Sequence, residues 1–227
     1  MHVKIVPSYR RRGVGRRPSQ ALERALIAGD RVTPALEAAT GTGFLVYPML
    51  HENERVEVEI GDNGALLFTL FATSPAGETT PVLRMSLGGS AGWGGLGQNE
   101  LLYLNERAGL DGDSAIHLVD ALTTNVMPGT AAQIGFLGSY NFLTPEGWST
   151  ICMPSVNNPP VIPVMSCMIE TDWYPQNTEF RSLLKRGETL HIRPDVPLGQ
   201  VMFLPREAVE LVEAEASDIE RFAPVTA

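Results

Sequence analysis

The chain has 227 residues, of which 44% are hydrophobic and 19% charged, and these proportions exclude an intrinsically disordered protein. Its net charge of −9 disfavours a nucleic-acid partner, because an acidic surface repels the phosphate backbone. The 22 glycines and 17 prolines favour many short strands joined by turns over a helical bundle. We therefore expect a single mainly-β domain over residues 1–227. Its fold should be an antiparallel β-sandwich or distorted barrel, with short helices in the N-terminal region and at the C-terminus.

The N-terminal region, residues 1–43, is expected to be an arm with two short helices. Residues 1–6 can form an edge strand. Helix-starting Ser19 and Pro34 and helix-stopping glycines predict helices over residues 19–28 and 33–41. The arginines between the edge strand and the first helix favour a solvated, flexible arm, with contact to an anion or a partner as the alternative. They are Arg10, Arg11, Arg12, Arg16 and Arg17.

The β core is expected to span residues 44–205, with a helix over 206–216 and a tail to residue 227. Alternation is clearest over residues 55–60, where valine and isoleucine alternate with glutamate ahead of a hairpin turn at 61–64. Residues 116–119 allow a strand, and residues 118–122 allow a helix instead. The other predicted strands are 44–50, 66–72, 82–87, 132–136, 139–143, 148–153, 164–173, 189–192 and 199–204.

Two further features bear on location. The basic N-terminal run is not followed by an apolar stretch, and no segment approaches the about 18 apolar residues of a membrane span, so we expect a cytoplasmic protein without a membrane partner. Cys152 and Cys167 lie in apolar surroundings and are expected to be buried, reduced thiols. A disulfide between neighbouring strands is the alternative.

Cofactor and metal motifs are weak. Residues 92–97 match G-x-G-x-x-G, but no βαβ pattern surrounds them, so we interpret them as a loop or lid carrying Trp93 and expect no cofactor. The histidines form no close pair, so we expect no bound metal. His51, His117 and His191 are the three that the fold would have to bring together to overturn this expectation.

The richest chemistry lies in residues 168–174, where Glu170 and Asp172 alternate with apolar and aromatic residues. On a strand the two carboxylates would share one face. Neighbouring carboxylates can divide acid and base roles, although they also commonly stabilise a strand edge or pair with an arginine such as Arg181. Aromatic residues nearby either pack in a core or line a pocket. We predict a binding pocket lined by Tyr140, Phe142, Trp148, Glu170, Asp172 and Trp173.

These segments also carry a family resemblance. Residues 139–148 (SYNFLTPEGW), the asparagine–proline loop at 154–160, residues 169–173 (IETDW) and residues 203–205 (FLP) together resemble the bacterial DUF6065 family of uncharacterised proteins. This resemblance implies a mainly β fold and no known activity. A weaker likeness is to the β-clip fold of dUTPase and dCTP deaminase, although the R-S-S phosphate-binding motif of that group is not present here.

The sequence therefore indicates a broad functional class and not a particular ligand or reaction. The leading hypothesis is a cytoplasmic β-domain that binds a small molecule or a protein partner in the aromatic and acidic pocket. The first alternative is an enzyme on the same scaffold, either metal-assisted or using Glu170 and Asp172 as an acid pair. The second is a structural subunit of an assembly, and a homo-oligomer is compatible with each of them.

Overall fold

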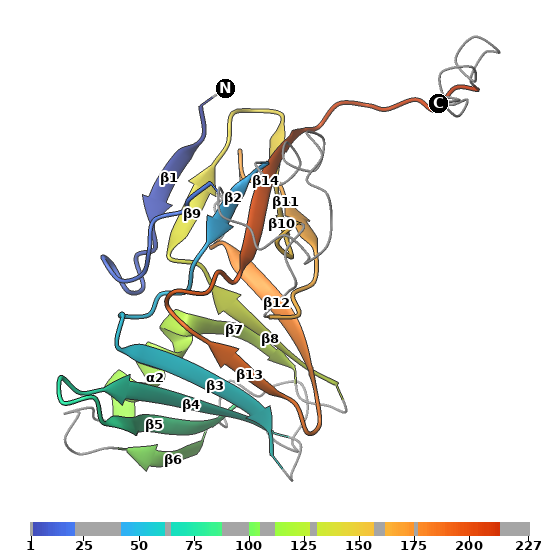
Figure 1. Ribbon diagram of the computed structural model, residues 1–227. Helices are drawn as coiled ribbons and strands as arrows, with labels where there is room; N and C mark the ends of the chain where they lie inside the picture. The colour runs from blue at the N-terminus through green and yellow to red at the C-terminus, as the bar shows by residue number, and fades with distance from the viewer. Residues whose placement is uncertain are drawn as a thin grey trace, which may run out of the picture.

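The computed structural model describes residues 2–20, 42–61, 65–87, 100–104, 112–127, 131–156, 162–174 and 177–213. Within these ranges the chain forms fourteen strands and one helix (Figure 1). The strands pair antiparallel in four sheets, none of them a closed barrel in the described part of the chain. The mainly-β fold class is therefore confirmed.

The largest sheet has the strand order β13-β3-β4-β5-β6 and forms the lower part of the molecule in Figure 1. Its strands are β13 (Thr189–Ile192), β3 (Glu54–Ile60), β4 (Leu66–Thr73), β5 (Thr79–Leu87) and β6 (Glu100–Leu104). Val56 and Val58 of β3 face the core, whereas Glu57 is partly exposed on the other face. The predicted hairpin of β3 and β4 is confirmed.

The upper part of the molecule in Figure 1 holds a four-stranded sheet, in the order β11-β10-β14-β2, beside a two-stranded one. The four strands are β11 (Cys167–Ile169), β10 (Trp148–Met153), β14 (Gly199–Pro205) and β2 (Phe44–Val46). The smaller sheet pairs β1 (Lys4–Pro7) with β9 (Tyr140–Leu143).

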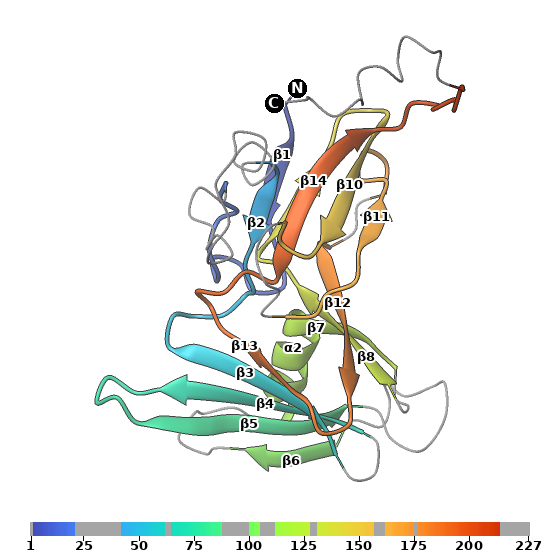
Figure 2. The ribbon, with the colours of Figure 1, turned by 45° about the vertical axis from the view of Figure 1, so that its right-hand side comes forward.

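A three-stranded sheet, β12-β8-β7, lies between these upper and lower parts (Figure 2). It consists of β12 (Glu179–Lys185), β8 (Ala131–Leu137) and β7 (Thr123–Met127), with helix α2 (Gly112–Leu122) leading directly into β7. One cluster of buried side chains draws on every one of the three larger sheets, with Phe68, Phe180 and Val201 among its fully buried members. The sheets therefore share a hydrophobic core.

The N-terminal arginines are not a free arm. Arg11 donates to both carboxylate oxygens of Glu54, at 2.9 and 3.0 Å, and to the Met49 carbonyl, and both charged side chains are only 13% exposed. Arg10 donates to the carbonyl of Asp120. The expectation of a solvated arm is therefore wrong for Arg10 and Arg11, which have partners on the body of the domain, whereas Arg12 and Arg17 are exposed as expected.

The structure also resolves one open choice and corrects two predictions. Residues 112–122 are helical, which resolves the open choice at 116–122. Of the strand predicted over 164–173, only Cys167–Ile169 form a strand. The predicted helix at 206–216 is wrong over residues 206–213, which have no regular structure and are exposed.

Several expectations lie outside the described residues. These are the N-terminal helices from residue 21 onward, the glycine-rich loop at 92–97 and the last residues of the predicted C-terminal helix. Among the residues that are described, no helix combines the length and the apolar composition needed to cross a membrane.

Candidate functional site

The predicted acid pair lies on a turn, not on a strand. Residues 171–173 form a turn directly after β11, and the Tyr174 N–H donates to the Glu170 carbonyl at 3.0 Å. We call residues 170–174 the acidic turn. The two carboxylates nevertheless converge, because Glu170 and Asp172 both pair with the guanidinium of Arg206, the residue that follows β14.

Asp172 holds three chain segments together. Its side chain is only 5% exposed, accepts the Gly147 N–H at 2.9 Å and forms a two-pronged ion pair with Arg206. The backbone N–H of Arg206 donates to the Gly147 carbonyl at 2.7 Å. The Arg206 guanidinium, helped by the Gly147 N–H, lowers the pKa of Asp172. A carboxylate fixed in its charged form is unsuited to donating protons near neutral pH, so this geometry argues for a structural role.

Glu170 has a different environment. Its side chain is 47% exposed, lies 3.2 Å from Arg206 and accepts a hydrogen bond from the indole N–H of Trp173. Glu146 adds a third carboxylate to the field around Arg206, since its charge helps to raise the pKa of that guanidinium. Three carboxylates around one cation leave the surface of this turn acidic.

Two large aromatic rings stand out from the acidic turn. Trp173 is 66% exposed and Tyr174 44% exposed, and their ring centroids are 5.4 Å apart. Met168, the middle residue of β11, is 64% exposed. Single exposed apolar residues are ordinary, but here two exposed rings lie against each other beside the Glu170 carboxylate, and the exposed Met168 lies two residues before Glu170 in the chain.

A chain of buried threonine hydroxyl groups links the acidic turn to its sheet. Thr144 donates to the Trp148 carbonyl at 3.0 Å, so its oxygen is left to accept from Thr171, 2.9 Å away. Thr171 in turn accepts from Thr150 of β10 at 2.7 Å. The hydrogen bonds therefore run in one direction, from Thr150 to Thr171 to Thr144, and tie the acidic turn to β10, an inner strand of its sheet.

The remaining predicted site residues do not gather around the acid pair as a pocket. Phe142 is a core residue, 3% exposed, with its ring centroid 5.4 Å from that of Phe203. Tyr140 lies on β9 opposite Pro7 of β1. Trp148 is half-buried as the first residue of β10, opposite Pro205, and directly follows Gly147, which bonds to Asp172 and Arg206. Arg181, the expected arginine partner, pairs with Glu179 instead.

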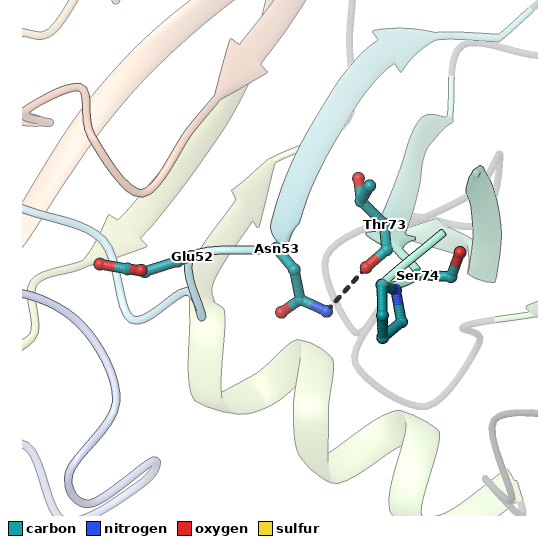
Figure 3. A pocket seen from close by; sticks show the side chains of 5 residues that line it. Glu52, Asn53, Thr73 and Ser74 are labelled. Atoms are coloured by element: carbon teal, nitrogen blue, oxygen red, sulfur yellow. Dashed lines mark hydrogen bonds between the residues drawn. The ribbon is translucent and has the colours of Figure 1, made fainter. Parts of the chain in front are cut away.

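An open surface pocket of about 450 Å³ lies elsewhere, between the loop that precedes β3 and the turn that joins β4 to β5 (Figure 3). It is lined by Glu52, Asn53, Thr73, Ser74 and Pro75, and the Asn53 side chain donates to the Thr73 carbonyl at 3.1 Å across it. None of these residues was predicted to bind a ligand.

The three histidines lie on separate elements. His51 is exposed in the loop before β3, His117 is exposed on α2, and His191 of β13 lies 3.5 Å from Glu57. Within the described ranges, no three histidine, cysteine or acidic side chains are grouped to hold a metal ion.

The chain matches no protein-family model, no curated protein and no solved structure. The resemblances to DUF6065 and to the β-clip fold therefore stay expectations.

Proposed function

We propose that this chain is a protein-binding domain whose contact surface is the acidic turn together with Met168. The observation that carries the proposal is the exposed Trp173–Tyr174 pair standing beside the half-exposed carboxylate of Glu170. Tryptophan, tyrosine and methionine are enriched at protein interfaces, and a few such anchors supply most of the binding energy.

A protein partner suits this surface better than a small molecule does. Small-molecule sites are concave and bury most of their ligand, whereas Trp173 and Tyr174 project from a turn with 66% and 44% of their surface exposed. Rings presented in this way can insert into a pocket on a partner, as interface anchors do.

The charge of the surface indicates the chemistry of the partner. Glu146, Glu170 and Asp172 outnumber the single cation of Arg206, and the whole chain carries a net charge of −9. A lysine or arginine side chain on the partner would gain both a carboxylate contact and a cation–π contact with an exposed ring. The proposed partner is therefore a protein segment that presents a basic residue beside an apolar one.

The proposal keeps the cytoplasmic location expected from the sequence. Cys152 and Cys167 are both free thiols, which is the usual state of cysteines in a reducing compartment.

The test is selection of peptides from a displayed random library against the immobilised protein, followed by affinity measurements in solution. We expect lysine- or arginine-containing peptides whose affinity falls at least about tenfold on Trp173→Ala, the loss typical of an interface anchor. We expect a several-fold loss on Glu170→Gln, smaller at high salt. Leu211→Ala is the matched control, because Leu211 is 94% exposed but lies outside the acidic turn.

Two outcomes would contradict the proposal. Selected peptides that bind Trp173→Ala as tightly as the wild type would place the contact surface elsewhere. A wild-type dimer that dissociates on Trp173→Ala would assign the surface to a second copy of the chain in place of a basic partner.

A further inference from the structure

The two cysteines face each other across neighbouring strands. Cys152 of β10 and Cys167 of β11 are directly opposite in the antiparallel register, so their side chains leave the same face of the sheet. Opposed Cα atoms in an antiparallel pair are about 4.5–5.5 Å apart, which lies within the about 4.4–6.8 Å that a disulfide spans. A bond between the two sulfurs would therefore need no change of register.

The environments of the two thiols are unequal. Cys152 is fully buried in the core, whereas Cys167 is half-buried at the edge strand of its sheet. A reagent from solvent therefore reaches the Cys167 sulfur before it can reach the buried Cys152 sulfur. This is the arrangement expected of an attacking thiol and a resolving thiol.

The charges around the pair favour the same division. A hydrogen bond from Cys152 and the nearby guanidinium of Arg181 lower the pKa of Cys167 to about 7, against the opposing effects of burial and of Glu179. The hydrogen bond with Cys167, together with burial, raises the pKa of Cys152. Glu179 and Arg181 both come from β12 and pair with each other at 2.9 Å. Near neutral pH, Cys167 is therefore partly thiolate, while Cys152 keeps its proton.

We propose that Cys152 and Cys167 form an oxidisable dithiol, in which Cys167 attacks a hydroperoxide and Cys152 then closes a disulfide between β10 and β11. In the first step the Cys167 sulfur bonds to one peroxide oxygen, the O–O bond breaks, and the departing alkoxide takes a proton from water. Cys167 is now a sulfenic acid.

In the second step the Cys152 sulfur attacks the Cys167 sulfur. The S–O bond breaks, and the oxygen leaves as water with the proton of the Cys152 thiol. The two thiols lose two electrons in total, and the peroxide gains two to give one alcohol and one water. Cys167 precedes Met168 on β11, so its sulfur leaves the opposite face of the strand from the Met168 side chain of the proposed contact surface. The dithiol proposal does not depend on the proposed binding function.

The test treats the reduced full-length chain with one equivalent of hydrogen peroxide and measures the intact mass and the thiol content. We expect the loss of two hydrogen atoms from the monomer, the loss of both thiols together, a peptide containing both cysteines on non-reducing digestion, and full reversal by dithiothreitol. Cys152→Ser should stop at the first step, with one oxygen added and a sulfenic acid trapped by dimedone.

Arg181→Gln provides a readout that leaves both thiols in place. We expect the oxidation rate at pH 7 to fall several-fold, because loss of the cation reduces the thiolate fraction of Cys167. Arg84→Gln is the matched control, since both arginine side chains are 44% exposed and ion-paired but Arg84 lies on another sheet. Wild-type protein that gains oxygen without a disulfide, forms only intermolecular disulfides, or keeps both thiols would overturn the proposal.

Discussion

The two carboxylates of the acidic turn show how neighbouring residues of one type take different roles. Asp172 is 5% exposed and ties the turn to Gly147 and Arg206, whereas Glu170 is 47% exposed and lies beside an exposed indole. The sequence places both acids in one short run and so leaves open whether they act together in binding or stabilise the fold. Burial, which depends on the packing of distant segments, assigns one to structure and leaves the other available to a partner.

The ion pair of Asp172 predicts a pH dependence of stability. Its pKa is lowered in the folded chain, so its contribution to stability is complete well above the usual aspartate pKa of about 4 and is lost as the pH falls through and below that value. Asp172→Asn removes the charge. We expect the wild type to be more stable than the variant in urea unfolding at pH 7, and this difference to shrink progressively below about pH 4.

The control for this measurement is Asp195→Asn, because Asp195 pairs with Arg193 two residues away and its side chain is 43% exposed. An exposed pair of this kind contributes little to stability. A wild-type advantage over Asp172→Asn that is equally large at pH 3 and pH 7 would show that the carboxylate charge is not what stabilises the turn.

At the scale of single elements, the hydroxyl chain under the acidic turn yields a second prediction. Thr171→Val keeps the side-chain shape but removes the central hydroxyl, leaving the buried Thr150 hydroxyl without its acceptor. We expect a loss of about 1–3 kcal/mol in the free energy of unfolding, measured in urea, because an unsatisfied buried donor is costly.

Thr171→Ser is the matched variant, since it keeps the hydroxyl and loses one buried methyl group. It should cost about 1 kcal/mol. If serine destabilises the chain as much as valine does, packing around the methyl group explains the effect and the hydroxyl chain contributes little.

The strands also show what a sequence pattern can and cannot predict. Strand β10 matches its predicted bounds, and β3 and β14 are predicted to within one residue. In β3 the reason is a regular alternation of apolar residues with glutamates, whereas β10 and β14 are short, mostly β-forming runs bounded by glycine or proline. Strand β12 was not predicted. The side chains on its buried face are Phe180, Ser182 and Leu184, and the serine interrupts the apolar pattern. The structure accommodates that serine because its hydroxyl donates to the Pro163 carbonyl at 2.8 Å.

The candidate site was predicted in part for a related reason. In the sequence, the alternation of acidic with other residues continues past Ile169 through Thr171 to Trp173. Periodicity alone therefore could not show that the strand ends at Ile169. Arg206 was missed as the partner of both acids, because it is 34 residues from Asp172 and reaches it only through the pairing of β14 with β10. Contacts of this kind follow from strand register, which a single sequence does not determine.

At the scale of the whole molecule, the central question is whether the sheets unfold together. Phe180 of β12 is fully buried, and a Cβ atom added at Gly199 of β14 would lie 2.6 Å from its ring. This close approach joins the three-stranded sheet to the four-stranded one. The shared core predicts one cooperative unit, as expected for the single domain that the sequence indicates.

Phe180→Ala tests this prediction, because it leaves a cavity at the junction. We expect the free energy of unfolding to fall by about 3–5 kcal/mol. Unfolding should be followed by far-UV circular dichroism, which reports all the strands, and by tryptophan fluorescence, to which Trp148 and Trp173 contribute from the four-stranded sheet and its turn. Both transitions should coincide in the wild type and shift together in the variant. If only one transition moves, the four-stranded sheet unfolds independently of the others, and the chain consists of two cooperative units whose contact at Phe180 is too weak to couple them.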